Sequence, residues 1–179
     1  MTRALGLLVA MLGLVVSAGG CSGPYVSGYT YYPQPATVEV LRREGNQQSP
    51  LMVLVSVLGV HNEDAHQGIP YSVVVRMRFE NVAQSKVTFD PASLELVTGT
   101  LRSFLRPRVT PAGVMSISPG ERKELTAYFP FPKDVAASDM NIQNLRLRWE
   151  VTIDSTPVIQ TVVFERAENG STVDYDEPY

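Results

Sequence analysis

The sequence has few of the residues on which disulfide-stabilised, metal-binding and redox proteins depend. Its 179 residues include one cysteine, Cys21, and two histidines, His61 and His66. A single thiol cannot form an intramolecular disulfide, so the folded chain must be held together by its core. The chain also lacks a nucleophile elbow, a phosphate-binding glycine loop and a paired-carboxylate motif. We therefore expect a protein that is not an enzyme.

An excess of basic residues is missing as well. Residues 37–166 contain 14 Lys or Arg and 14 Asp or Glu, so this part of the chain is neutral overall. A nucleic-acid-binding protein would show a clear basic excess, which leads us to expect no nucleic-acid partner. The remaining acidic residues lie in residues 167–179, which we expect to form an acidic, disordered tail. They are Glu168, Asp174, Asp176 and Glu177.

The N-terminus carries an apolar run that is too short to cross a membrane. It extends over about 13 residues from Ala4 to Val16, whereas a transmembrane helix needs about 20. Arg3 precedes the run, and the small residues Ser17-Ala18-Gly19-Gly20 follow it. A basic start, a short apolar segment and small residues are typical of an export signal that is later removed. We expect residues 1–20 to be this signal peptide.

Cys21 directly follows those small residues. The segment Ala18-Gly19-Gly20-Cys21 resembles the lipobox of bacterial lipoproteins. The resemblance implies that Cys21 carries a diacylglyceryl group and anchors the protein in a membrane of the bacterial cell envelope. Since Ser22 rather than Asp follows, it also implies the outer membrane. Two or more acyl chains anchor a protein stably. The alternative is an ordinary secretory signal cleaved nearby, which would leave Cys21 an incidental thiol.

Residues 22–36 are rich in Gly, Ser, Pro and Tyr and show neither strand nor helix periodicity. They predict that Cys21 is followed by a solvated tether up to residue 36, which could reach about 50 Å when fully extended. Four tyrosines lie in this stretch: Tyr25, Tyr29, Tyr31 and Tyr32. Their rings could lie at the level of the lipid headgroups, could contact a partner, or could be linker residues without a role.

Apolar and polar residues alternate through residues 37–166, which predicts a single antiparallel all-β domain. Such alternation places Val73, Val75, Met77 and Phe79 on one face of a strand and Leu145, Leu147, Trp149, Val151 and Ile153 on one face of another. We expect an immunoglobulin-like antiparallel β-sandwich of about seven to nine strands. The expected strands are Thr37–Arg42, Leu51–Val60, Ser72–Glu80, Lys86–Asp90, Ser93–Val97, Leu101–Val109, Glu121–Phe129, Asn144–Asp154 and Val158–Glu165.

A second resemblance covers most of residues 70–165. It rests on segments that include Val87-Thr88-Phe89-Asp90, Leu94-Glu95-Leu96 and Ser118-Pro119-Gly120-Glu121. These are similar to segments of the telokin-like, immunoglobulin-fold domains of bacterial lipoproteins. Such domains are mostly of unassigned function, and the resemblance implies secretion and binding more than chemistry.

Both histidines fall in the polar turn His61-Asn62-Glu63-Asp64-Ala65-His66. Imidazole and carboxylate groups together can hold zinc or copper, so His61, His66 and either Asp64 or Glu63 are candidate ligands. The alternative is a solvated loop between strands, with no cofactor.

Four arginines occupy outward positions of two expected strands: Arg76, Arg78, Arg146 and Arg148. They would form one basic stripe, and a contact surface for a partner, if the two strands belonged to the same sheet. The alternative is a solvated face on which they pair with Glu80 and Glu150.

Taken together, these features predict a membrane-anchored envelope lipoprotein whose β-sandwich is a noncatalytic interaction or structural module for an unknown envelope protein partner. The alternative function is metal or small-ligand binding by the loop from His61 to His66.

Overall fold

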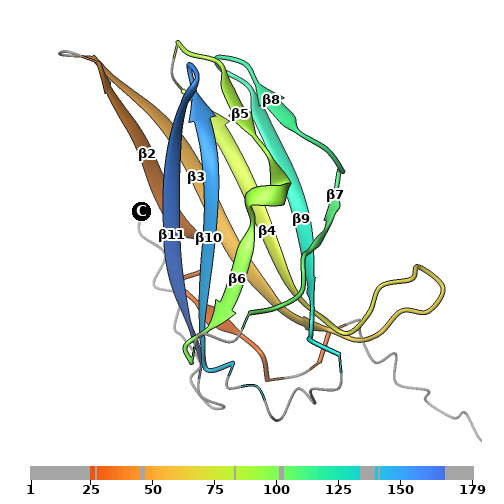
Figure 1. Cartoon of the computed structure of the whole chain (residues 1–179). Coiled ribbons are helices and arrows are strands. Elements are labelled where there is room, and N and C mark those ends of the chain that lie inside the picture. Colours follow the sequence, from red (N-terminus) through yellow and green to blue (C-terminus); the bar gives the residue numbers. More distant parts are fainter. Residues whose placement is uncertain are drawn as a thin grey trace, which may run out of the picture.

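The computed structural model describes residues 25–26, 28–44, 47–82, 84–100, 103–133, 140 and 142–167. Nearly all of this part of the chain is β-strand or the turns between strands (Figure 1). The strands are β1 (Tyr31–Tyr32), β2 (Ala36–Glu44), β3 (Gln47–His61), β4 (Ser72–Asn81), β5 (Val87–Phe89), β6 (Glu95–Thr98), β7 (Arg108–Thr110), β8 (Met115–Ile117), β9 (Arg122–Pro130), β10 (Asn144–Ile153) and β11 (Thr156–Arg166), and the 3-10 turn η1 covers Pro91–Ser93.

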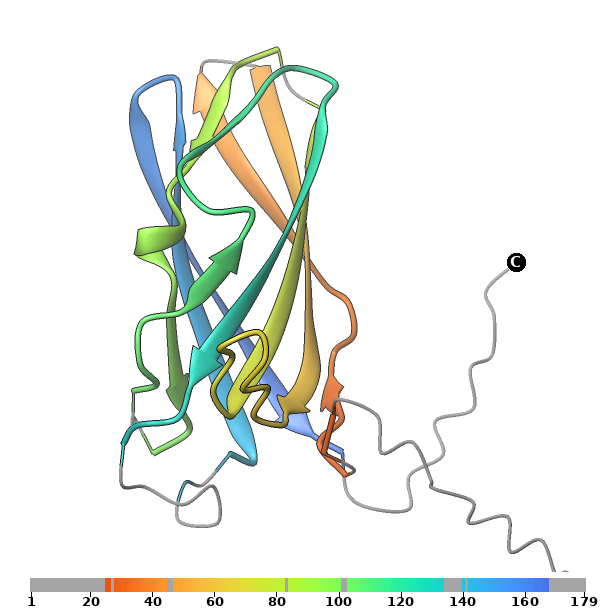
Figure 2. The same ribbon diagram turned by 90° about the vertical axis from the view of Figure 1, so that its right-hand side faces the viewer.

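The strands form two antiparallel sheets that pack face to face (Figures 1 and 2). We call the sheet with the order β2-β3-β4-β9-β7 the front sheet, and the sheet with the order β1-β11-β10-β5-β8, in which β6 also pairs with β10, the back sheet. Strands β3, β4, β9 and β7 take the places of strands A, B, E and D of an immunoglobulin domain. Strands β5 with β6, β10 and β11 take the places of C, F and G. The predicted immunoglobulin-like sandwich is confirmed.

The long expected strands are confirmed, whereas the strand expected over Leu101–Val109 is wrong. Within the described part of that range, only Arg108 and Val109 belong to a strand, β7. Pro107 and Pro111 flank β7, and a proline cannot donate to a sheet ladder, which keeps β7 a three-residue edge strand. The two- and three-residue strands β1 and β8 were not expected, because segments this short show no readable alternation.

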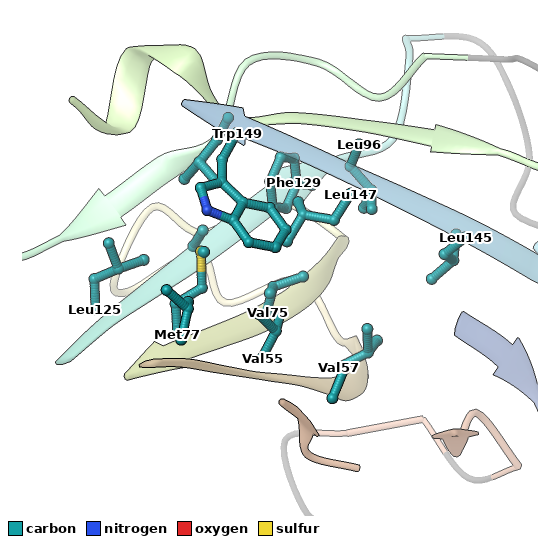
Figure 3. Packing of buried hydrophobic residues seen from close by; sticks show 14 of the residues in the cluster. Val55, Val57, Val75, Met77, Leu96, Leu125, Phe129, Leu145, Leu147 and Trp149 are labelled. Atoms are coloured by element: carbon teal, nitrogen blue, oxygen red, sulfur yellow. The ribbon is translucent and has the colours of Figure 1, made fainter. Parts of the chain in front are cut away.

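The core lies between the two sheets and is built from the alternating positions that the sequence predicts. Trp149 of β10 is fully buried at its centre, between residues of both sheets (Figure 3). Its indole N–H has no hydrogen-bond acceptor among the described residues, so Trp149 stabilises the fold through the apolar area it buries. The predicted inward positions are all 0–1% exposed: Val73, Val75, Met77, Phe79, Leu145, Leu147, Trp149, Val151 and Ile153.

The described residues between Tyr25 and Ala36 are not the solvated tether that their composition predicts. Tyr31 is fully buried, and its hydroxyl donates a hydrogen bond to the Ile142 carbonyl at 3.0 Å. Strand β1 pairs with the end of β11, and the Ala167 N–H donates to the Thr30 carbonyl at 2.8 Å. The folded domain therefore begins well before Thr37. A two-residue strand between glycine- and proline-rich segments has no periodicity by which the sequence could reveal it.

We call the described residues between Tyr25 and Ala36 the N-terminal strap. The strap contacts both sheets at one end of the sandwich: Tyr25 bridges to His61 at the end of β3, and Tyr31 pairs with Arg166 at the end of β11. Figures 1 and 2 both show it at the lower end of the molecule. We call this the strap end. The opposite, far end carries the turns after β4, before β9 and between β10 and β11.

Replacing Tyr31 by Phe should lower the free energy of unfolding at neutral pH by about 1 kcal/mol, because a buried hydrogen bond is lost. Burial also raises the pKa of the Tyr31 hydroxyl well above 10, an effect that nearby Arg166 partly opposes. The neutral form is therefore favoured in the folded state. The stabilisation of the folded state that follows from this raised pKa is complete below pH 10 and is lost as the pH rises above 10.

Urea unfolding between about pH 9.5 and 11.5 tests this expectation. The free energy of unfolding should fall less steeply with pH in Tyr31→Phe than in the unmodified chain. Tyr32→Phe is the control, since Tyr32 is the neighbouring residue of β1 and only half-buried. Equal pH slopes in the unmodified chain and in Tyr31→Phe would contradict the expectation.

Candidate functional site

The four candidate arginines do not form one basic stripe. Arg76 and Arg78 lie on β4 in the front sheet, whereas Arg146 and Arg148 lie on β10 in the back sheet. All four take positions that alternate with core residues, so the two pairs lie on opposite outer faces of the sandwich. The condition for a single stripe, that both strands belong to the same sheet, is therefore not met. Alternation assigns each residue to a face of its strand but does not tell which sheet the strand joins.

The outer face of the front sheet has a shallow groove of about 210 Å³ over β3, β4 and β9. Strand pairing places Ser56 opposite Arg76 and Leu54 opposite Arg78. Pro35, in the strap, lies at its border. The groove is lined by Pro35, Leu54, Ser56, Arg76, Arg78 and Glu124. It therefore combines two guanidinium groups, one carboxylate and an apolar part.

The two arginines of the groove differ in their ionic partners. Arg78 Nε lies 3.2 Å from Glu80 Oε1, and Arg122 Nε lies 3.3 Å from the same oxygen. Glu80 thus compensates the positive charge of Arg78 and of Arg122. Arg76 forms no ion pair with any residue that the structure describes, and it is exposed. A guanidinium group presents a planar set of donors that suits a carboxylate, so Arg76 can bind an anionic group entering the groove.

His61 is held by packing at the strap end. Its ring lies edge-on between Tyr25 and Tyr128, with centroid distances of 5.4 and 5.8 Å and interplanar angles of 85° and 88°. The Nδ1 atom lies 2.5 Å from the Asn62 carbonyl, which makes this nitrogen the donor because a carbonyl only accepts. His61 is 9% exposed. The arrangement gives the imidazole a structural role in closing this end of the front sheet.

Asp64 and His66, the other two residues of the predicted metal site, take part in a turn after β3. Asp64 Oδ1 accepts hydrogen bonds from the backbone N–H groups of His66 and Gln67, both at 3.0 Å. In the described part of the chain, no three His, Cys, Asp or Glu side chains come close enough together to hold a metal ion. His61, Asp64 and His66 are therefore not assembled as a three-ligand set. Their spacing could not show this, because a loop does not fix the direction of its side chains.

Tyr25 and Tyr29 bind the strap to the sandwich. A β-bulge interrupts β3 between Val57 and Gly59, and the Tyr25 ring packs on Gly59. The Val26 N–H donates to the Val60 carbonyl at 2.8 Å. The Arg166 guanidinium lies 4.3 Å from the centre of the Tyr29 ring, a cation–π contact. Burial raises the pKa of the Tyr25 hydroxyl, with a further increase from Tyr128 and an opposing effect of Arg76.

Because Leu51–Val60 is almost continuously apolar, the sequence allowed two placements: a central strand covered on both faces, or a strand packed partly against the tether. It did not decide between them, although Gly59 offered a signal. A lone glycine inside an apolar strand often marks a bulge or the close approach of another backbone. Gly59 does both: its φ is +117°, and a Cβ there would lie 2.8 Å from the Tyr29 carbonyl oxygen. What the sequence did not contain is the identity of the approaching segment.

No family model matches this sequence, and no curated protein matches it. Among solved structures, the yjhA protein from Bacillus subtilis is similar with a TM-score of 0.36 and 12% identity, over 54% of this chain and 71% of that one. The GAE domain of GGA2p from Saccharomyces cerevisiae is similar with a TM-score of 0.27 and 18% identity, over 75% of this chain and 99% of that one. Scores this low carry no argument about fold or function.

Among the residues that the structure describes, no helix has the length and apolar character needed to cross a membrane.

Replacing Gly59 by Ala should displace the strap, because the new methyl group would collide with the Tyr29 carbonyl. Gly120→Ala is a matched control: Gly120 also has a positive φ, of +76°, but nothing lies within 4 Å of a Cβ there. We expect Gly59→Ala to lower the free energy of unfolding by about 1–3 kcal/mol more than Gly120→Ala. Urea unfolding measures both. Equal losses would show that the close approach of the strap contributes nothing to stability.

Proposed function

We propose that this protein is a lipid-anchored protein of the bacterial cell envelope whose β-sandwich binds a partner protein and catalyses no reaction. The observation that carries the proposal is the groove on the front sheet, where Arg76 lacks an ion pair within the described residues. Arg146 and Arg148 belong to the opposite face and are not part of this surface.

The groove suits one side chain of a partner rather than a larger ligand. Its volume of about 210 Å³ is below the range of about 300–1,000 Å³ that is typical of pockets for small molecules. The carboxylate of an Asp or Glu could bind the Arg76 guanidinium while its aliphatic stem packs on Leu54 and Pro35. An ionic contact at the centre of a protein surface favours specificity and orientation. An envelope protein with an exposed acidic side chain is therefore the partner that fits this surface.

The back sheet fits this role less well. Arg148 Nη1 lies 3.7 Å from Glu95 Oε2, and both side chains are about half exposed. An exposed pair of this kind compensates its own charge and contributes little energy. We therefore assign partner binding to the front sheet.

The lipid anchor is supported by the order of features at the N-terminus. The apolar run, the small residues and Cys21 are followed by only three residues before the strap begins at Tyr25. Acylation of Cys21 would attach the lipid almost directly to a folded domain. The groove would then be presented to other proteins of the same membrane.

Replacing Cys21 by Ser in the full chain should release the protein from the membrane, because the serine hydroxyl cannot form the thioether that carries the acyl chains. Expressed in a bacterium with two membranes, the unmodified chain should enter the detergent phase of a detergent partition and Cys21→Ser the aqueous phase. Ser22→Ala is the control and should behave like the unmodified chain. Mass spectrometry that finds a free Cys21 thiol on the native protein would refute the anchor.

Photo-crosslinking in intact cells tests the assignment of the partner surface. A crosslinking residue is placed at Thr126, which pairs with Arg76, or at Thr161, which pairs with Arg148. We expect a strong adduct from position 126 only, and we expect Arg76→Glu to reduce it about tenfold, which corresponds to about 1.4 kcal/mol. Arg148→Glu should leave it unchanged. Adducts of equal strength from both positions, or an adduct that survives Arg76→Glu, would contradict the proposal.

A further inference from the structure

We infer that the strap end of the sandwich is the surface that contacts the lipid bilayer, and that the far end points away from it. This inference rests on the proposed function, because it assumes that Cys21 carries the acyl chains. It adds a fixed orientation, which anchoring alone does not provide.

Only three residues separate Cys21 from the strap. Tyr25 is four residues from Cys21, and an extended chain spans at most about 3.6 Å per residue. The Tyr25 backbone therefore lies within about 14 Å of the acylated residue. A tether that ran freely to residue 36 would have allowed about 50 Å. Docking of the strap removes most of this freedom.

The strap is held at one end of the sandwich. Tyr25 bridges to His61 at the last residue of β3, and Tyr31 pairs with Arg166 at the last residue of β11. The strap is thus fixed to both sheets at the same end of the sandwich, as Figure 2 shows. Tyr25, the described residue nearest to Cys21 in the sequence, is held at this end.

The dimensions of the sandwich separate its two ends. Strand β10 runs from one end to the other over ten residues, which corresponds to about 33 Å at about 3.3 Å per residue. This length is more than twice the distance of about 14 Å that the chain from Cys21 to Tyr25 can span. Upright on its strap end, the domain would hold its far-end turns well beyond the headgroup region.

The side chains at the strap end suit a headgroup surface. Tyr25 and Leu105 are 39% and 41% exposed, and the Leu105 N–H donates to the carbonyl of Pro130, the last residue of β9. Arg106 and Lys133 are exposed nearby in sequence. Amphipathic rings and long cationic side chains are favoured at membrane interfaces, where the ring or stem is buried and the polar tip stays in water. End-on contact also leaves the groove open to the side.

Two glutamines at opposite ends provide a matched test. Gln67 lies in the loop between β3 and β4 at the strap end, and Gln84 lies in the turn between β4 and β5 at the far end. Both are exposed. Since the Cys21 sulfur is consumed by the lipid, Gln67→Cys and Gln84→Cys each introduce the only free thiol. Each variant is labelled with a fluorophore and reconstituted, in lipidated full-length form, into phosphatidylcholine vesicles with and without a headgroup-labelled quencher lipid.

We expect quenching of the fluorophore at position 67 to be at least threefold stronger than at position 84. Flotation of the vesicles is measured on the same samples and shows separately whether the protein is attached to the membrane. Protein that floats but is quenched equally at both positions, or more strongly at position 84, overturns the orientation and leaves the anchor intact. Protein that does not float overturns the proposed anchor and the orientation with it.

An insertion separates the effect of tether length from that of the domain itself. Twelve Gly and Ser residues inserted after Gly23 lengthen the free chain without changing the strap. Because such a linker is flexible, quenching at position 67 should fall toward the value at position 84. If the difference between the two positions persists unchanged, the short tether does not set the orientation, and the inference is wrong.

Discussion

The packing of two alternating β-faces against each other is the constraint on which the rest of this structure depends. With one cysteine, which cannot pair within the chain, no disulfide supports the fold. Trp149 and the inward residues of β4 and β10 are fully buried, and this burial decides which side chains are left outside. The groove with Arg76 exists because its lining residues, apart from Pro35 of the strap, are the outward members of strands whose inward members form the core.

The strap turns this sandwich into a domain with two unequal ends. Burial of Tyr31 and the edge-on contacts of His61 with Tyr25 and Tyr128 tie one short N-terminal segment to both sheets. His61, a candidate metal ligand by sequence, thereby contributes to docking. A lipid attached just before the strap would be connected to a rigid domain by a short chain. Docking of the strap would therefore restrict the orientation of the domain relative to the membrane.

The elements that could be predicted from the sequence are those with a long period-two pattern. Strands β4, β9 and β10 alternate clearly enough to show which face is apolar, whereas the apolar runs of β3 and β11 predict a strand without showing its inward face. The short strands β1, β7 and β8 escaped prediction because two or three residues carry too little periodicity. They form only by pairing with distant segments: β1 with β11, β7 with β9, and β8 with the equally short β5. The groove escaped it as well, since Pro35, Arg76 and Glu124 come together only through the pairing of separate strands.

The sequence by itself determined the class of fold, the inward residues of β4 and β10 and the expectation of an export signal that ends just before Cys21, because local patterns of neighbouring residues carry each of them. Only the tertiary structure decided that Arg76 and Arg146 lie on opposite faces and that the tyrosine-rich segment is part of the domain. The physical reason is that these outcomes depend on which edges and faces meet. Such meetings are set by packing between residues far apart in the chain, and no local pattern records them.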